Sequence, residues 1–134
     1  MSRGAEFDDG YRMSHRPALQ GSGMHEAHEV YPDIHEHPEY YFTAHDSDDR
    51  RIKSETTRAL VATRGRPDAD VTMHRAVPKH VNEIHPGDWV TPSKSYAQQH
   101  AAGEGDMHVI SAKTKAKHLI ASGDHPPEFG YAPA

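Results

Sequence analysis

An arginine, a serine and a glutamate in the C-terminal half of the chain have the chemistry to bind a phosphorylated sugar. Arg75 lies in a β-prone run, Ser93 stands at the start of a helical segment, and Glu128 lies in a tail rich in proline and aromatic residues. A guanidinium binds phosphate through paired N–H donors, and a helix start offers backbone N–H groups to anions. An arginine in one strand, and a second strand that leads through Ser93 into a helix, together predict a binding site for an anion and a sugar.

Each of the three residues also has a simpler interpretation. Met73 and Val77 share the strand face of Arg75, so its charge needs a partner, and that partner could be a structural salt bridge. Ser93 could be only a helix cap, and Glu128 could be a surface acid with no role. The three in this order mean more than each does separately.

The elements that must position these residues follow from local patterns. Ser93 is the expected N-cap of a helix, and alternation of side chains from Met107 onward favours a strand. A short element over Ala116–Ile120 and an aromatic strand near the C-terminus complete this half. The predicted elements are strands Val71–Val77, Asp88–Thr91 and Met107–Lys115, and a helix Lys94–Ala102.

A further helix is predicted from about Asp48 to Thr63. One modest apolar face recurs at helical spacing, and the chain then reads Arg-Gly-Arg-Pro, which is typical of a helix end. The face is formed by Ile52, Thr56, Ala59, Leu60 and Thr63. We expect this helix to pack on a sheet that contains all three predicted strands, which makes the fold class α+β.

The N-terminal part, residues 1–45, is predicted to be an irregular and largely polar extension, and residues 46–134 to be the main domain. The unit after Val71 is too small to bury a sufficient core alone. Four aromatic residues lie within a dozen positions of the extension, at Tyr31, Tyr40, Tyr41 and Phe42. We therefore expect these rings to pack on the later strands.

Histidine is the compositional outlier, with 13 residues in 134. His25 and His28, and then His35 and His37, resemble metal ligands at first sight. A helical zinc motif needs two histidines four residues apart with a glutamate beside the first, whereas these are spaced differently and interrupted by prolines. The segment is interpreted as a polar, histidine-rich surface, and no metal site is predicted.

Composition limits the function classes. Apolar residues make up 34% of the chain and its formal net charge is −5, which argues against a general nucleic-acid binder. Cysteine is absent, which excludes disulfides and thiolate metal sites. No apolar run of membrane-spanning length and no signal-peptide core occurs. These features predict a soluble, cytoplasmic protein without a membrane partner.

Three segments together resemble the ADP-ribosyltransferase superfamily of the Arg-Ser-Glu type. They are VTMHRAVP at Val71–Pro78, DWVTPSKSYAQQHAA at Asp88–Ala102 and EFGY at Glu128–Tyr131. They are most similar to the short ADP-ribosyltransferase-like proteins of bacteriophages that infect actinobacteria. The resemblance covers roughly Val71 to Pro133, and upstream segments such as GYRMSHRP at Gly10–Pro17 are also similar.

The resemblance implies a small split β-sandwich with peripheral helices, a cleft between two sheets, and cleavage of NAD at the nicotinamide–ribose bond. By position, Arg75 would hold the NAD phosphates or ribose, and Ser93 would orient the cleft and the catalytic acid. Glu128 would bind the ribose 2′-hydroxyl and stabilise the oxocarbenium-like transition state. The aromatic floor for nicotinamide, a flat cation, would come from Trp89 or Tyr96.

Several positions depart from the family pattern. The serine motif reads Thr-Pro-Ser-Lys-Ser, so Ser93 and Ser95 compete for one role. Pro126 stands where arginine-modifying members carry a second glutamate, which weakens protein-arginine transfer as the activity. His74 is a further candidate for NAD binding, but neighbouring strand residues point to opposite faces, so only His74 or Arg75 can serve the cleft.

Two functions from different classes follow. The first is an NAD-dependent mono-ADP-ribosyltransferase or NAD glycohydrolase, acting on an unknown host macromolecule in the host cytoplasm during phage infection. The second is a non-catalytic phage module on the same fold that binds a host or virion protein. The retained Arg75, Ser93 and Glu128 favour the enzyme, while the small core and the missing second glutamate favour the binding module.

Overall fold

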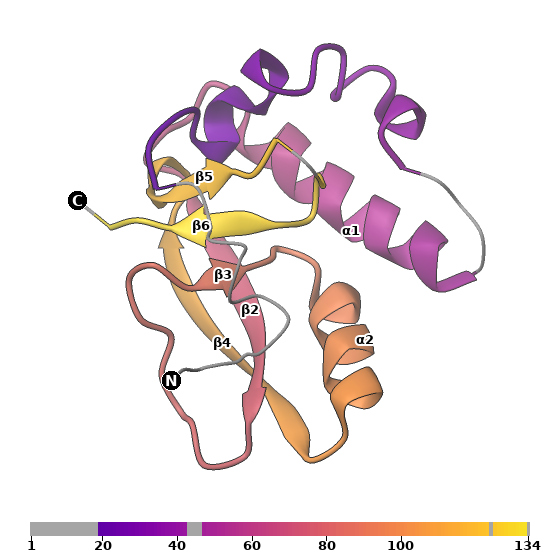
Figure 1. Ribbon diagram of the computed structural model, residues 1–134. Coiled ribbons are helices and arrows are strands. Elements are labelled where there is room, and N and C mark those ends of the chain that lie inside the picture. The colour runs from indigo at the N-terminus through magenta and orange to yellow at the C-terminus, as the bar shows by residue number, and fades with distance from the viewer. Residues whose placement is uncertain (1–18, 43–46, 124, 134) are drawn as a thin grey trace.

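The computed structural model describes residues 19–42, 47–123 and 125–133 as a small α+β protein with two antiparallel sheets (Figure 1). Residues 1–18 of the predicted extension, which include Gly10–Pro17, lie outside the described residues. One sheet pairs β2 (Asp70–Pro78) with β4 (Met107–Lys115). The other has the order β3-β6-β5, formed by Trp89–Val90, Phe129–Tyr131 and Leu119–Ala121.

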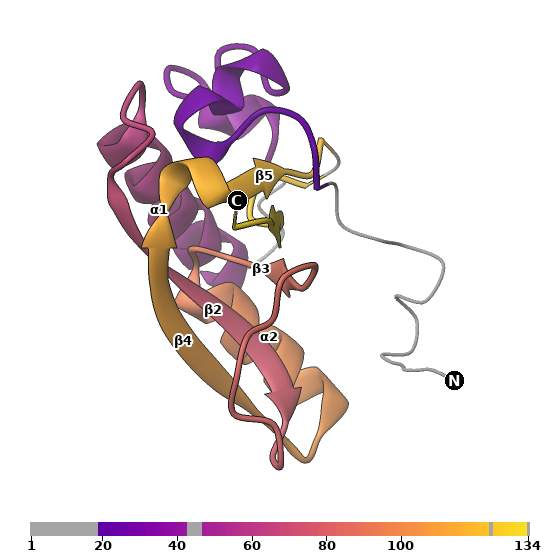
Figure 2. The same cartoon turned by 90° about the vertical axis from the view of Figure 1, so that its left-hand side faces the viewer.

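The β2–β4 ladder is the longest pairing in the described chain, and Figure 2 shows the two strands side by side as a twisted ribbon. Its register runs from Asp70 opposite Lys115 to Pro78 opposite Met107. The buried side chains of β2 recur at every second residue near its start, as expected for a strand with one face on the core. The predicted bounds of both strands are confirmed to within one residue.

The prediction that all three strands share one sheet was wrong for β3. β3 pairs with β6, and its backbone connection to β2 in the described chain is a bridge between His74 and Thr91, the residue after β3. In that bridge the His74 N–H donates to the Thr91 carbonyl at 2.8 Å, and the Thr91 N–H donates to the His74 carbonyl at 3.0 Å. Pro92 follows directly and has no N–H to donate, so the pairing with β2 stops there.

Two helices are attached to this framework. α1 (Ser47–Thr63) confirms the predicted helix and its buried face, with Ile52, Thr56, Leu60 and Thr63 each less than 5% exposed. Gly65 follows two residues after the helix end, and its φ of +70° is the left-handed conformation that favours glycine after a helix. α2 (Lys94–Glu104) extends two residues beyond the prediction. α2 packs against β2 and β4, and α1 packs against α2.

The segment before α1 contributes directly to the core. Short 3₁₀ helices, η2 (Met24–Glu29) and η3 (Pro38–Tyr40), fold this segment beside α1 and β5 (Figure 1). Its four buried core residues pack with residues of α1 and of both sheets; they are Met24, Ala27, Tyr31 and Ile34.

The expected packing of the aromatic residues is therefore only partly confirmed. Tyr31 is 3% exposed, and Tyr41 and Phe42 pack against the core as partly buried side chains. Tyr40 is 65% exposed and stacks on His37 instead, with 4.7 Å between the ring centroids. Tyr41, and not Tyr40, lies beside Tyr31, in an edge-on arrangement with 5.3 Å between the ring centroids.

The chain after β4 builds the second sheet. η4 (Ala116–His118) leads into β5, and β6 lies between β5 and β3. Phe129 of β6 is completely buried, whereas Glu128 immediately before it is partly exposed. Among the described residues, no helix combines the length and the apolar character needed to cross a bilayer.

Ile34→Ala should lower the free energy of unfolding by about 2–5 kcal/mol, because it removes a completely buried side chain and leaves a cavity. Tyr40→Ala is the matched control and should change the free energy by no more than about 0.5 kcal/mol, since its ring is exposed. Urea unfolding monitored by circular dichroism measures both. An Ile34→Ala protein as stable as wild type would show that the segment before α1 is not part of the cooperative core.

Candidate functional site

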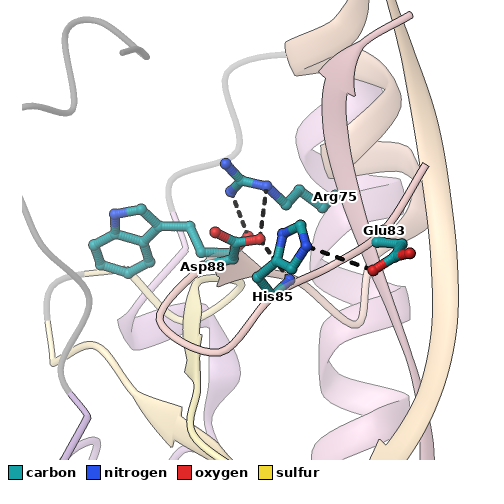
Figure 3. A network of polar contacts seen from close by, with 5 residues as sticks. Arg75, Glu83, His85 and Asp88 are labelled. Carbon is teal, nitrogen blue, oxygen red and sulfur yellow. Dashed lines mark hydrogen bonds and ion pairs between the residues drawn. The ribbon is translucent and has the colours of Figure 1, made fainter. Parts of the chain in front are cut away.

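Arg75 lies in the middle of β2 and reaches β3. Its Nη1 donates a hydrogen bond to the Trp89 carbonyl at 2.8 Å, and its Nε lies 3.6 Å from Oδ2 of Asp88 (Figure 3). The Arg75 and Asp88 side chains are 29% and 25% exposed. The strand arginine thus has the acidic partner that its surroundings require.

Asp88 also closes the turn that precedes β3. Its Oδ2 accepts a hydrogen bond from the His85 N–H at 2.8 Å, and the His85 carbonyl accepts the Asp88 N–H at 3.0 Å. The His85 ring lies 3.5 Å from the exposed Glu83 carboxylate (Figure 3). Gly87, with φ of +93°, supplies the left-handed conformation within this turn. Asp88 therefore holds both the turn and the Arg75 guanidinium.

His74 has a different environment from Arg75, as the strand alternation predicts. Its Nδ1 lies 2.7 Å from Oγ of Ser111, directly across the ladder on β4. Burial lowers the pKa of His74, and the Lys94 ammonium lowers it further, while the Glu55 carboxylate opposes both. Of the two neighbours, Arg75 is the one whose side chain contacts β3.

Ser93 is completely buried and caps α2, as predicted. Its Oγ accepts the N–H of Tyr96 at 3.1 Å, and its own N–H donates to Oγ1 of Thr91 at 3.0 Å. The same hydroxyl donates to Oε1 of Glu55 at 2.9 Å. Ser93 therefore connects α2 to α1 through its side chain, and its backbone N–H connects it to Thr91, the residue after β3.

Glu55 of α1 occupies the start of α2. Its Oε1 accepts the N–H of Ser95 at 2.9 Å in addition to the Ser93 hydroxyl, and its Oε2 accepts the Ser95 hydroxyl at 2.8 Å. Burial raises the pKa of Glu55, but the hydrogen bonds from Ser95 and Ser93 and the charge of Arg51 outweigh it and hold this pKa below its ordinary value. The carboxylate is thus charged at neutral pH.

This arrangement corrects the prediction that the helix start is open to an anionic ligand. The N–H of Ser95 is bound by Glu55, that of Tyr96 by the Ser93 hydroxyl, and that of Ala97 by the Ser93 carbonyl at 3.2 Å. The protein's own carboxylate fills the position that a phosphate would take. The physical reason is that α1 packs against α2 and brings Glu55 to its first turn.

Glu128 is held from α2. The Tyr96 hydroxyl donates a hydrogen bond to Oε2 of Glu128. The Tyr96 ring also contacts His100 and His125, with centroid distances of 4.6 and 5.5 Å. Because the Tyr96 N–H is bound by Ser93, the candidate acid and the candidate serine are linked through one residue.

The pairing of β3 with β6 connects Arg75 to the strand that follows Glu128. Trp89, whose carbonyl Arg75 binds, lies opposite Gly130 in the β3–β6 pair, and Val90 lies opposite Phe129, the residue after Glu128. Arg75 is attached to one strand of this pair, and Glu128 directly precedes the other. Tyr96 binds the Ser93 hydroxyl through its backbone N–H and binds Glu128 through its own hydroxyl, while Arg75 is connected to the β3–β6 pair through Trp89.

The histidine-rich segment forms no such centre in the part of the chain that the structure describes. No three histidine or acidic side chains gather there in a way that could hold a metal ion. The His28 and His35 rings lie 6.0 Å apart, and His37 lies 3.0 Å from the Glu39 carboxylate. Burial, and then the charge of Arg64, lowers the pKa of His35.

Sequence reasoning missed Asp88 and Glu55 as parts of the site. Asp88 follows a proline–glycine turn and could have been recognised as an acid within reach of a strand arginine. Glu55 lies three residues after Ile52 and four before Ala59, at the edge of the apolar face of α1. No pattern in the sequence distinguishes this glutamate from one on a solvent-exposed edge of the helix.

Comparison of the chain with protein-family models, curated proteins and solved structures found no match.

The free energy of unfolding should fall as the pH drops below about 6.5, and His35 should account for part of this loss. The folded state lowers the pKa of His35, so above this pH both states are neutral, whereas below it the unfolded state takes up the proton first. His35→Phe should therefore show a shallower loss of stability between about pH 7 and about pH 5. Urea unfolding across this range measures the slope, with the exposed His80→Gln as the control for loss of a surface histidine. An unchanged slope in His35→Phe would contradict the assignment.

Proposed function

We propose that this protein is an NAD-dependent enzyme of the ADP-ribosyltransferase type that cleaves the nicotinamide–ribose bond. It either transfers ADP-ribose to an acceptor in a host cell or acts as an NAD glycohydrolase. The observation that carries the proposal is the hydrogen bond from Tyr96 to Glu128 at the point where β3, β6 and the start of α2 meet. It gives the expected catalytic acid a fixed orientation, and the ordered Arg-Ser-Glu pattern gives that acid a role.

Glu128 is the catalytic residue in this proposal. Its carboxylate would accept the ribose 2′-hydroxyl and oppose the positive charge that develops on the ribose as nicotinamide leaves. A preorganised group aimed at developing charge stabilises a transition state by about 3 kcal/mol. Tyr96 donates to one carboxylate oxygen and so limits rotation of the group.

Arg75 would bind the NAD phosphates. The Trp89 carbonyl and the Asp88 carboxylate engage its Nη1 and Nε and so set the plane of the guanidinium. Because Glu55 already fills the start of α2, the phosphates would depend on Arg75 and not on the helix. The nicotinamide would lie on the ring of Trp89 or Tyr96, and Ser93 would act by holding the first turn of α2.

A second candidate is a non-catalytic module on the same fold that binds a host or virion protein. The observation that favours it is that Asp88 pairs with Arg75 and Glu55 with Ser93. The Arg75 and Ser93 side chains therefore both have structural partners, and these partners explain why the two residues are present without any ligand.

Glu128→Gln should reduce nicotinamide release on the order of 100-fold and leave NAD affinity nearly unchanged. The amide still forms a hydrogen bond to a ribose hydroxyl but carries no charge to oppose the oxocarbenium ion, so kcat falls while KM does not rise. Nicotinamide release measured by chromatography gives the rates, and NAD-dependent thermal shift gives the affinity. Glu104→Gln, an exposed glutamate on α2, is the control and should retain wild-type turnover.

Arg75→Lys should weaken NAD binding by roughly tenfold or more, since it keeps a charge beside Asp88 but loses the fork that pairs with phosphate. The same two measurements apply. A wild-type protein that neither releases nicotinamide nor gains thermal stability with NAD would remove the enzyme proposal and leave the binding module. Equal turnover in wild type and Glu128→Gln would remove Glu128 as the catalytic acid.

A further inference from the structure

Glu55 is the residue through which α1 reaches the candidate site. Its two carboxylate oxygens accept hydrogen bonds from the Ser93 hydroxyl, the Ser95 N–H and the Ser95 hydroxyl, at 2.8–2.9 Å. All three partners are donors, and they lie at the N-cap and in the first turn of α2. A carboxylate, which only accepts, suits three donors better than any neutral side chain does.

The contacts continue from this carboxylate to Glu128. Because the Ser93 hydroxyl gives its proton to Glu55, its lone pairs are directed to the Tyr96 N–H. This fixes the backbone of Tyr96, and the hydroxyl of the same residue binds Glu128. The path therefore runs from α1 through two residues of the α2 start to the acid that precedes β6.

We propose that Glu55 is a positioning residue that sets the orientation of Glu128 through Ser93 and Tyr96. The inference deepens the proposed function, on which its kinetic part rests, by assigning control of the catalytic carboxylate to a residue of α1. The lowered pKa of Glu55 supports it, since the carboxylate stays charged across the neutral range. The positive end of the α2 dipole also favours a negative charge at this point.

The position of Tyr96 is the direct readout. The protein is labelled with 3-fluorotyrosine, and the ¹⁹F resonance that disappears in Tyr96→Phe is assigned to Tyr96. Glu128→Gln gives the change in this resonance when the partner carboxylate loses its charge. Glu55→Ala should shift the Tyr96 resonance by at least half as much, because the first turn of α2 loses its anchor.

Two further variants keep the test decisive. Ser95→Ala removes one of the contacts to Glu55 and should shift the resonance less than Glu55→Ala. Glu104→Ala, a glutamate at the other end of α2, is the matched control and should leave the resonance in place. If Glu55→Ala does not fold, Glu55→Gln takes its place, since the amide keeps an acceptor for Ser95 and loses the charge. A Tyr96 resonance that stays at its wild-type position in these folded Glu55 variants would overturn the inference.

Kinetics separate this inference from the proposed function. In an active protein, Glu55→Gln should lower kcat roughly tenfold and leave KM unchanged, because an effect through the orientation of Glu128 acts in the transition state. An active wild type with unchanged kcat in a folded Glu55→Gln would contradict the positioning role alone. A wild type without nicotinamide release would contradict the proposed function, and the ¹⁹F shifts would still decide whether Glu55 positions Tyr96.

Discussion

The corner formed by Thr91, Pro92 and Ser93 is the constraint on which the arrangement of this protein depends. Thr91 exchanges two backbone hydrogen bonds with His74 and thereby joins the two sheets. Pro92 stops that pairing, and Ser93 begins α2. Within three residues the chain passes from one sheet past the other and into a helix. The corner thereby joins β2, the strand of Arg75, to the start of α2, whose Tyr96 binds Glu128.

A charge supplied by the protein itself stabilises the corner. Ser93 is completely buried, and a buried hydroxyl without partners would cost about 1–3 kcal/mol. It has partners on both sides, in Tyr96 and Glu55. The arrangement that satisfies this hydroxyl also withdraws the helix start from use as an anion site. The N–H groups at the start of α2 could either stabilise the corner or bind an anionic ligand. Here the contacts to Glu55 use them to stabilise the corner.

Local sequence patterns were sufficient to predict α1, β2, α2 and β4, because each depends on periodicity and on residues near its ends. Sheet membership of β3 could not be obtained this way, since two residues carry no pattern and their partner, β6, lies about forty positions away. Arg75, Ser93 and Glu128 could be identified as candidates from their residue types and order, but the residues that they contact could not. Glu55 and Asp88 are ordinary surface acids by composition, and only the packing of α1 on α2 and the turn before β3 brings them to Ser93 and Arg75.

The Arg75–Asp88 pair is the point at which the two functions differ most in physical terms. A pair that is about a quarter exposed on both sides and separated by 3.6 Å contributes little to stability, about 0–1 kcal/mol, after screening by solvent. The same guanidinium also donates a hydrogen bond to the Trp89 carbonyl at 2.8 Å, so the ion pair is not its sole structural contact. A phosphate competes well with a carboxylate held at that distance, because it accepts two parallel N–H donors from one guanidinium. In the proposed enzyme, Asp88 would orient the guanidinium for such a ligand, whereas in the proposed binding module the ion pair and the hydrogen bond to Trp89 would serve to hold β2 against β3.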